Sequence, residues 1–242
     1  MNTWQDKTIV VVGASGAIGS AVTKRILKDN PKKIYLLSKN ILHKQEKYCH
    51  HIRLDYDSES SIRRSADTIS NDEEIDMVFV ATGILHNETI MPEKSFSEIN
   101  AEKFLTVFTA NMIFPALIAK HFLPLLNTKT PSIFAALSAR VGSISDNHLG
   151  GWYAYRCSKA ALNMFIKSAS IEQSRKNKKS IVIGLHPGSV DSNLSNPFKN
   201  NIPKDKLFSP SYCAEKLLEV LATIQNKQSG KIYAWDGKEV LP

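Results

Sequence analysis

Short apolar runs alternate along the chain with longer segments whose apolar residues recur at helical spacing. The runs predict strands at residues 7–12, 33–38, 50–55, 76–81, 131–138, 180–186 and 231–235. The periodic segments predict helices at residues 17–29, 58–69, 100–126, 153–175 and 209–224. Strands that alternate with helices of this length form βαβ units. We therefore predict an α/β fold, a single doubly wound parallel sheet of about seven strands flanked by helices.

Length and composition support one folded domain. The chain has 242 residues, of which 43% are hydrophobic and 22% charged, so it is not of the disordered class. No run of eighteen apolar residues occurs and the N-terminus has no secretory pattern, so we expect no membrane span. Cys49, Cys157 and Cys213 show no paired spacing, which predicts neither a disulfide framework nor a metal site. A cytoplasmic protein is expected.

The charge balance is basic. The formal net charge is +8, from 31 Lys and Arg against 23 Asp and Glu. The positive residues are dispersed except at residues 175–179, where they end a predicted helix and complement its dipole. The excess charge can also attract an anionic small molecule. We expect no nucleic-acid partner.

A glycine-rich turn follows the first predicted strand and opens a helix. In doubly wound sheets, ligands bind beyond the carboxyl ends of the strands. Glycines permit close approach of backbone N–H groups to phosphate, and the helix N-terminus adds positive potential. The position therefore predicts a Rossmann-type dinucleotide site. The expected contacts in this turn are Gly13, Ser15, Gly16, Ala17, Ile18 and Gly19.

The next two strand ends bear on the choice of dinucleotide. After Ser38 the chain has Lys39 where an NAD site usually has a carboxylate for the ribose 2′-OH. A cation there suits the 2′-phosphate of NADP, so we expect NADP rather than NAD. The alternative is that Lys39 is only an exposed loop residue. Asp55 ends the third strand, where it either binds the adenine amino group or caps the following helix.

Tyr155 and Lys159 are candidates for proton transfer. Four residues apart on a helix, they share a face. A cation about 4 Å away at an effective dielectric of 20 gives roughly 4 kcal/mol, which would lower the tyrosine pKa by about three units toward 7. The phenol would then exchange a proton with a carbonyl or alcohol oxygen. Two other Tyr–Lys pairs have this spacing, Tyr35 with Lys39 and Tyr212 with Lys216. Only Tyr155 follows both a strand with a polar end and a glycine-rich loop.

Two further segments contain candidates. Pro115 lacks the N–H that the carbonyl of Asn111 needs, so the helix should kink there. The freed carbonyl either holds a water that passes protons to Lys159, or the bend serves packing alone. After the sixth strand, Pro187 and Gly188 force a turn.

We expect Val190 and Ser192, just after that turn, to contact the nicotinamide and its carboxamide. His186 is expected to make local hydrogen bonds rather than to act as a base. The long segment 193–208 is expected to cover the substrate.

Four motifs occur in the order and spacing of a known family: residues 13–19, Asn111, Tyr155 with Lys159, and Pro187-Gly188. Together they resemble the short-chain dehydrogenase/reductase family over nearly the whole chain. Residues 137–144 and 150–156, with residues 81–83 and 92–95, look most like its C-factor and sniffer-type carbonyl reductase branch.

The resemblance implies roles for these residues. Tyr155 would be the catalytic acid/base, Lys159 its pKa-lowering partner and a ribose ligand, and Asn111 the holder of a relay water. It also implies hydride transfer at C4 of the nicotinamide. Assembly as a homodimer or homotetramer would use the helices that carry Asn111 and Tyr155.

The chain departs from the family pattern in three places. The middle glycine of the first turn falls at Ala17, and Gly16 is shifted by one position. After the fourth strand, residues 80–83 read Val-Ala-Thr-Gly where the family has Asn-Asn-Ala-Gly, which removes two amide side chains. We expect Ala81, Thr82 and Gly83 in the cofactor site.

The third departure concerns the catalytic serine, whose register position is Ala139. A one-residue slip on a strand turns a side chain to the other face. Either the loop bulges so that Ser138 or Ser143 serves, or Tyr155 polarises the substrate alone; we favour Ser138.

Two functions follow from the sequence. The first is an NADP-dependent oxidoreductase that acts on a small carbonyl or alcohol. The second, which the C-factor resemblance implies, is a dinucleotide-binding signalling or regulatory protein with little turnover.

Overall fold

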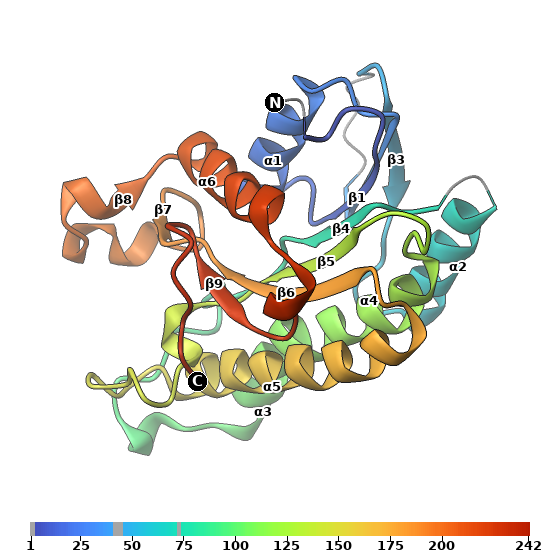
Figure 1. The fold of residues 1–242 in the computed structure, drawn as a ribbon. Helices are drawn as coiled ribbons and strands as arrows, with labels where there is room; N and C mark the ends of the chain where they lie inside the picture. The colour runs from blue at the N-terminus through green and yellow to red at the C-terminus, as the bar shows by residue number, and fades with distance from the viewer. Residues whose placement is uncertain (1–2, 41–45, 72–73) are drawn as a thin grey trace.

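The computed structural model of the protein describes residues 3–40, 46–71 and 74–242. Its centre is a parallel seven-stranded sheet with the order β3-β2-β1-β4-β5-β6-β9 (Figure 1). The strands are β1 (Thr8–Val12), β2 (Lys33–Ser38), β3 (Cys49–Arg53), β4 (Met77–Val80), β5 (Ser132–Leu137), β6 (Ser180–His186) and β9 (Ile232–Ala234). The chain winds outward from β1 in one direction and from β4 in the other. The predicted doubly wound α/β fold is confirmed.

Helices cover both faces of the sheet (Figure 1). The cluster on one face includes residues of α1 (Ala17–Leu27) and α6 (Pro210–Thr223). The cluster on the other includes residues of α2 (Glu59–Ser70), α4 (Phe114–Phe122) and α5 (Tyr153–Lys176). Successive side chains of a strand alternate between these clusters, so β1 and β4 are buried on both faces. This burial explains why those strands read as continuous apolar runs rather than as alternating ones.

The long helix predicted for residues 100–126 is interrupted. It consists of α3 (Ala101–Phe108), a π-helical segment Thr109–Ile113, α4 and a 3₁₀ turn Leu123–Leu125. The N–H of Phe114 donates to the carbonyl of Thr109, five residues earlier. Pro115 follows at once and has no N–H to offer. The predicted disruption near Asn111 is therefore present, in the form of a π insertion.

Among the described residues, one helical stretch, Ala101–Leu125, is long and apolar enough to cross a membrane by length and composition. We expected no membrane span, because our criterion required uninterrupted apolar residues, and polar residues such as Asn111 and Lys120 interrupt this stretch. Core helices pass the same test. Ile118, Ala119 and Phe122 of this stretch are completely buried in the cluster on one face of the sheet.

Segment 193–208 is more ordered than its lack of periodicity indicated. It contains 3₁₀ turns at Asn196–Asn201 and Lys204–Lys206 and ends in β8 (Leu207–Phe208). This strand pairs with β7 (Ser189–Val190) in a small parallel ribbon apart from the main sheet (Figure 1). Two-residue strands are too short to show a period, so they could not be predicted from the pattern of apolar residues.

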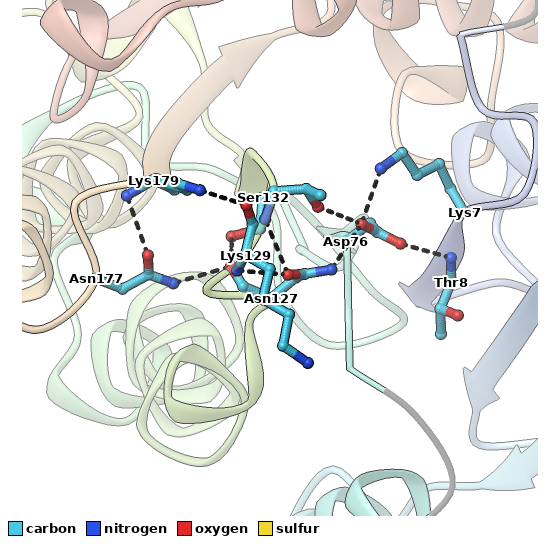
Figure 2. Close-up of polar contacts among 9 residues, drawn as sticks. Lys7, Thr8, Asp76, Asn127, Lys129, Ser132, Asn177 and Lys179 are labelled. Carbon is cyan, nitrogen blue, oxygen red and sulfur yellow. Dashed lines mark hydrogen bonds and ion pairs between the residues drawn. The ribbon is translucent and has the colours of Figure 1, made fainter.

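Polar contacts hold together the edge of the sheet where the strands begin (Figure 2). The carboxylate of Asp76, just before β4, accepts hydrogen bonds from Lys7 Nζ at 3.0 Å and from the N–H of Thr8 at 3.0 Å. It also accepts one from Asn127 Nδ2 at 3.3 Å, and Asn177 Nδ2 donates to the carbonyl of Asn127 at 3.1 Å. These contacts join the starts of β1 and β4 to the segments before β5 and β6. The candidate chemistry lies at the opposite edge.

Candidate functional site

A cleft of about 640 Å³ opens beyond the carboxyl ends of β1 and β4, where the direction of winding reverses. The expected cofactor residues that line it are Gly13, Ser15, Gly16, Lys39, Ala81, Thr82 and Gly83. The residues that sequence reasoning missed are Tyr56, Asp57, Ile84, Asn87, Leu105, Thr106, Thr109, Ala110 and Phe114. Most of the second group come from α3, its π extension and the loops after β3 and β4. The sequence motifs did not indicate that these elements lie beside the glycine turn.

The glycine turn is built for close backbone contact. Gly13 has φ +82°, and a Cβ there would lie 2.9 Å from Thr82 Cγ2. A Cβ on Gly19 would lie 2.3 Å from the carbonyl oxygen of Gly13, so the start of α1 rests directly on the turn. Gly16, the N-cap of α1, supplies no capping side chain, which leaves first-turn N–H groups for an anion. The shift of Gly16 by one position therefore keeps the features that a phosphate needs.

Thr82 supplies an independent sign that the cleft takes a polar ligand. Its hydroxyl is buried and has no hydrogen-bond partner among the described residues. A buried hydroxyl without a partner is costly, and a ligand in the cleft would satisfy it. The cradle around Gly13 and this hydroxyl both fit a dinucleotide.

The loops after β2 and β3 meet at one side of the cleft. Lys39 Nζ lies 3.9 Å from an oxygen of Asp57 and 5.0 Å from the ring centroid of Tyr56. Ser38 is buried, and its hydroxyl donates to the carbonyl of Asn40 at 2.5 Å.

Asp55 and Ser58 have separate tasks in the loop after β3. Ser58, not Asp55, caps α2, and the carboxylate of Asp55 accepts the N–H of Asp57 at 3.0 Å. The alternative that Asp55 caps the helix is therefore wrong. Its contact with adenine stays a prediction.

Tyr155 and Lys159 lie together on α5, both buried. Lys159 Nζ is 5.8 Å from the centroid of the Tyr155 ring and donates to the carbonyl of Leu137 at 2.9 Å. Burial raises the pKa of Tyr155 to about 12 and lowers the pKa of Lys159 to about 8. The expected tyrosine pKa near 7 is wrong for the protein without cofactor. Desolvation outweighs the attraction, because the ammonium lies over the ring and is hydrogen-bonded elsewhere.

Asn111 joins the segment after β4 to α5. Its amide nitrogen donates to the carbonyl of Ile84 at 2.8 Å and to Ser158 Oγ at 3.1 Å, while its oxygen accepts the N–H of Ile84 at 2.7 Å. A Cβ on Gly83 would lie 3.1 Å from Asn111 Oδ1 and 3.4 Å from Lys159 Nζ. A larger residue at this position would crowd the amide of Asn111 and come into contact with the ammonium of Lys159. The structure thus brings Asn111 and Lys159 together beside Gly83, while the relay water stays a prediction.

The two candidate serines are engaged elsewhere. Ser138 Oγ donates to Asn163 Oδ1 at 2.5 Å, and Asn163 is eight residues after Tyr155, about 12 Å along the helix. Ser143 Oγ accepts the N–H of Asp146 at 3.1 Å within its own turn. The turn that contains Gly142 does approach α5 closely, but the contact is between the backbone of Gly142 and that of Lys159. Our preference for Ser138 is not supported by this geometry, because its hydroxyl serves the packing of β5 on α5.

The expected nicotinamide residues lie beyond β6 and do not line the main cleft. Gly188 has φ +75°, and a Cβ there would lie 2.6 Å from the ring of Phe208. Ser192 Oγ donates to the carbonyl of Val190 at 3.3 Å. Pro187 precedes this turn, as expected, and its carbonyl accepts a weak hydrogen bond from the thiol of Cys213. Their contact with nicotinamide stays a prediction.

His186 differs from expectation. Its Nδ1 is buried and has no partner among the described residues. Burial lowers its pKa to about 4, with the positive charge of Arg140 acting in the same direction, so the ring is neutral at pH 7. The expected local hydrogen bond is absent at this nitrogen.

Aromatic side chains from three loops gather near Tyr155. The ring centroid of Trp152 lies 6.3 Å from that of Tyr155 and 5.1 Å from that of Phe198 in segment 193–208. His86 adds a ring contact to Phe198 at 5.9 Å, and its Nε2 lies 3.0 Å from the carbonyl of Asn193. The segment therefore rests on the loop after β4 and on the start of α5. Sequence reasoning assigned segment 193–208 to covering the substrate but had no signal for these contacts.

Comparison with known proteins agrees with this geometry. A family model described as short chain dehydrogenase matches residues 7–202. The C-signal protein of Myxococcus xanthus is 28% identical over 146 residues, which cover 60% of this chain and 82% of that protein. The benzil reductase ((S)-benzoin forming) of Bacillus cereus is 23% identical over 235 residues, or 89% and 94% of the two chains.

Solved structures show the same fold. The NADPH-bound carbonyl reductase from chicken fatty liver has a TM-score of 0.85 at 21% identity. The carbonyl reductase Sniffer of D. melanogaster has a TM-score of 0.84 at 20% identity. Each match covers 98% of this chain and 100% of the other.

The buried ammonium of Lys159 should make stability depend on pH. The unfolded chain holds this proton up to about pH 10.5 and the folded protein only to about 8, so the unfolded state binds more protons between these values. The free energy of unfolding therefore rises with pH in that window, by about 2 kcal/mol between pH 8 and pH 9.5.

The test compares two lysine variants of α5. We expect Lys159→Met to lose this rise in urea titrations without cofactor at pH 7.5 and 9.5. Lys167→Met, on the exposed side of the same helix, should keep it. Equal pH dependence in the two variants would contradict the assignment.

Proposed function

The chain belongs to the short-chain dehydrogenase family, and on this premise we propose that it is an NADP-dependent oxidoreductase that transfers a hydride between nicotinamide and a carbonyl or alcohol substrate. The observation that carries the proposal is the approach of Asn111 and Lys159 to Gly83, which lines the cleft together with the glycine turn, and the position of Lys159 Nζ over the ring of Tyr155. The coarser conclusion, an oxidoreductase of this family, holds without these assignments.

The proposed mechanism uses Tyr155 as an acid in the direction of reduction. NADPH supplies the hydride when it is bound. Because the pKa of Tyr155 is about 12, its hydroxyl is protonated at neutral pH and can donate to the oxygen of the substrate as negative charge develops there. Lys159 is charged below about pH 8 and stabilises the phenolate that remains. Asn111 holds the segment after β4 in place beside them.

The proposal leaves polarisation of the substrate oxygen to Tyr155 alone. Ala139 stands at the register position of the family serine, and the hydroxyls of Ser138 and Ser143 are engaged with Asn163 and Asp146. Of the alternatives that the sequence left open, this one needs no rearrangement of β5 or of the following turn.

We assign segment 193–208 to covering the substrate. Its contacts with His86 and Trp152 hold it against the start of α5, close to Tyr155. A cover that excludes water strengthens the electrostatic interactions on which proton transfer depends.

A second candidate function is a dinucleotide-binding regulatory protein with little turnover. Two observations favour it, the similarity to the C-signal protein and the absence of a serine at the family position. Tight NADP binding without reduction of any carbonyl would support this function over the first. A cytoplasmic location and the absence of nucleic-acid and membrane partners stay predictions for either function.

Loss of the Tyr155 hydroxyl should abolish reduction. We expect Tyr155→Phe to consume NADPH at least about a hundredfold more slowly than the wild type with a panel of aldehydes, ketones and quinones. Calorimetry should show unchanged NADPH affinity, because the cleft residues are untouched. Equal rates for the two proteins would end the proposal.

Ser138→Ala is the matched control for that experiment. It removes the hydroxyl that donates to Asn163 and should keep activity within about threefold of the wild type. A loss as large as that of Tyr155→Phe would show that Ser138, rather than Tyr155 alone, polarises the substrate.

Lys39 should decide the choice between NADP and NAD. We expect Lys39→Ala to weaken NADPH binding about tenfold and to leave NADH binding unchanged, since only NADPH offers a 2′-phosphate to the ammonium. Asp57→Asn should act in the opposite direction, because it removes the carboxylate that now lies 3.9 Å from this ammonium. Calorimetric titration of both dinucleotides measures the effects. Equal changes for NADPH and NADH would contradict the assignment.

We also propose a homodimer or homotetramer that uses the helices bearing Asn111 and Tyr155. Ile113 in the π segment, and Met164 and Ile171 on α5, are apolar and exposed. A second copy of the chain would cover them and gain hydrophobic stabilisation. Sedimentation equilibrium should give two or four times the mass of the chain, 27.0 kDa. A single-chain mass at micromolar concentration would contradict the proposal.

A further inference from the structure

The helix that carries Tyr155 has no cap of its own. Its N-cap residue, Trp152, is in the left-handed conformation with φ 51° and makes no side-chain capping bond, and the first turn has no acidic residue. The first N–H groups of a helix need acceptors from outside. Tyr155 is the third residue of this helix, so whatever caps the helix also fixes the backbone of the phenol.

Glu93 supplies the missing cap from the loop after β4. Its carboxylate accepts the N–H of Ala154 at 3.2 Å, and its backbone carbonyl accepts the N–H of Trp152 at 2.5 Å. The residue is only 2% exposed. A buried carboxylate is costly unless it is bonded, and the positive end of a helix dipole is a favourable place for it.

The turn before the helix is held from the other side by Arg156. Gly150 and Gly151 are both left-handed, with φ +64° and +63°. Arg156 Nε donates to their carbonyls at 3.2 and 3.0 Å, and its Nη1 donates to the carbonyl of Val141 at 3.4 Å. Glu93 therefore binds the N–H groups of this segment and Arg156 the carbonyl groups. We call these two residues the α5 clamp.

The clamp also holds the backbone of Trp152, whose ring contacts the rings of Tyr155 and Phe198. A Cβ on Gly151 would lie 3.3 Å from the carbonyl oxygen of Glu93, so the backbone at Gly151 also packs closely against Glu93. A left-handed tryptophan is strained and persists only where its surroundings fix it. The same contacts thus fix the backbone of the phenol and the ring that covers it.

We propose that Glu93 is a positioning residue for Tyr155: by capping α5 and holding Trp152, it sets the orientation of the phenol toward the substrate. The effect on rate rests on the proposed function. The ordering of the first turn of α5 does not, and it is measurable without turnover.

The kinetic test compares Glu93→Ala with Glu98→Ala. Glu98 accepts the N–H of Lys94 at 3.0 Å close by in the chain and makes no hydrogen bond to α5 among the described residues, so it is the matched control. Glu93→Ala should lower kcat about tenfold or more, because small misplacements of a reacting group are costly, and leave NADPH affinity within about twofold. Glu98→Ala should keep the kcat of the wild type.

Two further variants of Glu93 complete the kinetic test. Glu93→Gln keeps an acceptor oxygen for the N–H of Ala154 and should therefore keep most of the wild-type kcat. If Glu93→Ala does not fold, Glu93→Asp replaces it, since its shorter side chain withdraws the carboxylate from Ala154.

The second readout is the fluorescence of Trp152 and does not need a substrate. Replacement of the other two tryptophans, Trp4 and Trp235, by Phe leaves it as the single emitter. The backbone carbonyl at position 93 still accepts the N–H of Trp152 in Glu93→Ala, but the bond from Ala154 is lost and the first turn of α5 loosens. Acrylamide quenching of Trp152 should therefore rise about twofold in Glu93→Ala and stay unchanged in Glu98→Ala.

An unchanged kcat in folded Glu93→Ala overturns the proposal, as does a loss of kcat with unchanged quenching. If the wild type reduces no carbonyl compound, the proposed function fails and quenching alone decides: a rise supports the clamp and no change overturns it.

Discussion

The burial of one ammonium group, that of Lys159, governs the arrangement of the site. Its charge is removed from bulk water and held by the carbonyl of Leu137 at the end of β5. A Cβ on Gly142 would lie 2.8 Å from the backbone carbon of Lys159, and a Cβ on Gly83 would lie 3.4 Å from its Nζ. The backbone therefore closes in around this lysine from two strand ends. Such burial costs stability, and a buried cation that lowers stability is the kind of feature found at functional sites.

The fold brings these strand ends together through its topology rather than through local sequence. The sheet winds outward from β1 and β4, so the turns that follow them diverge and leave a cleft. The π insertion then turns Asn111 toward the segment after β4. With a regular helix, the register of residues after Thr109 would differ by about one residue, or roughly 100°, which would turn this amide away. An irregularity in one helix is thus required for contact between three elements.

The sequence predicted the features that depend on local pattern and failed where burial or distant contacts decide. The strands and helices were recognisable because each shows its period or length, and the glycine turn and the Tyr155–Lys159 pair are local motifs. The pKa of Tyr155 was predicted in the wrong direction, because spacing shows a neighbouring cation but not the loss of water around both groups. Ser138 was favoured because the sequence does not indicate its hydrogen bond to Asn163, which lies on a separate element. Glu93 lies in residues 92–95, which contributed to the family resemblance, but nothing indicated its contact with α5, since it lies 61 residues before the N–H that it caps.

The raised pKa of Tyr155 and the lowered pKa of Lys159 together constrain the proposed chemistry. Between about pH 4 and 8, the phenol is neutral, the ammonium is charged, and the ring of His186 is neutral. The site then has a proton donor beside a positive charge, which suits the arrival of negative charge on a substrate oxygen. Oxidation of an alcohol instead needs the phenolate, which this environment disfavours until a ligand changes it. Within the proposed function, the electrostatics of Tyr155 and Lys159 therefore favour reduction, and they do so without a serine at position 139.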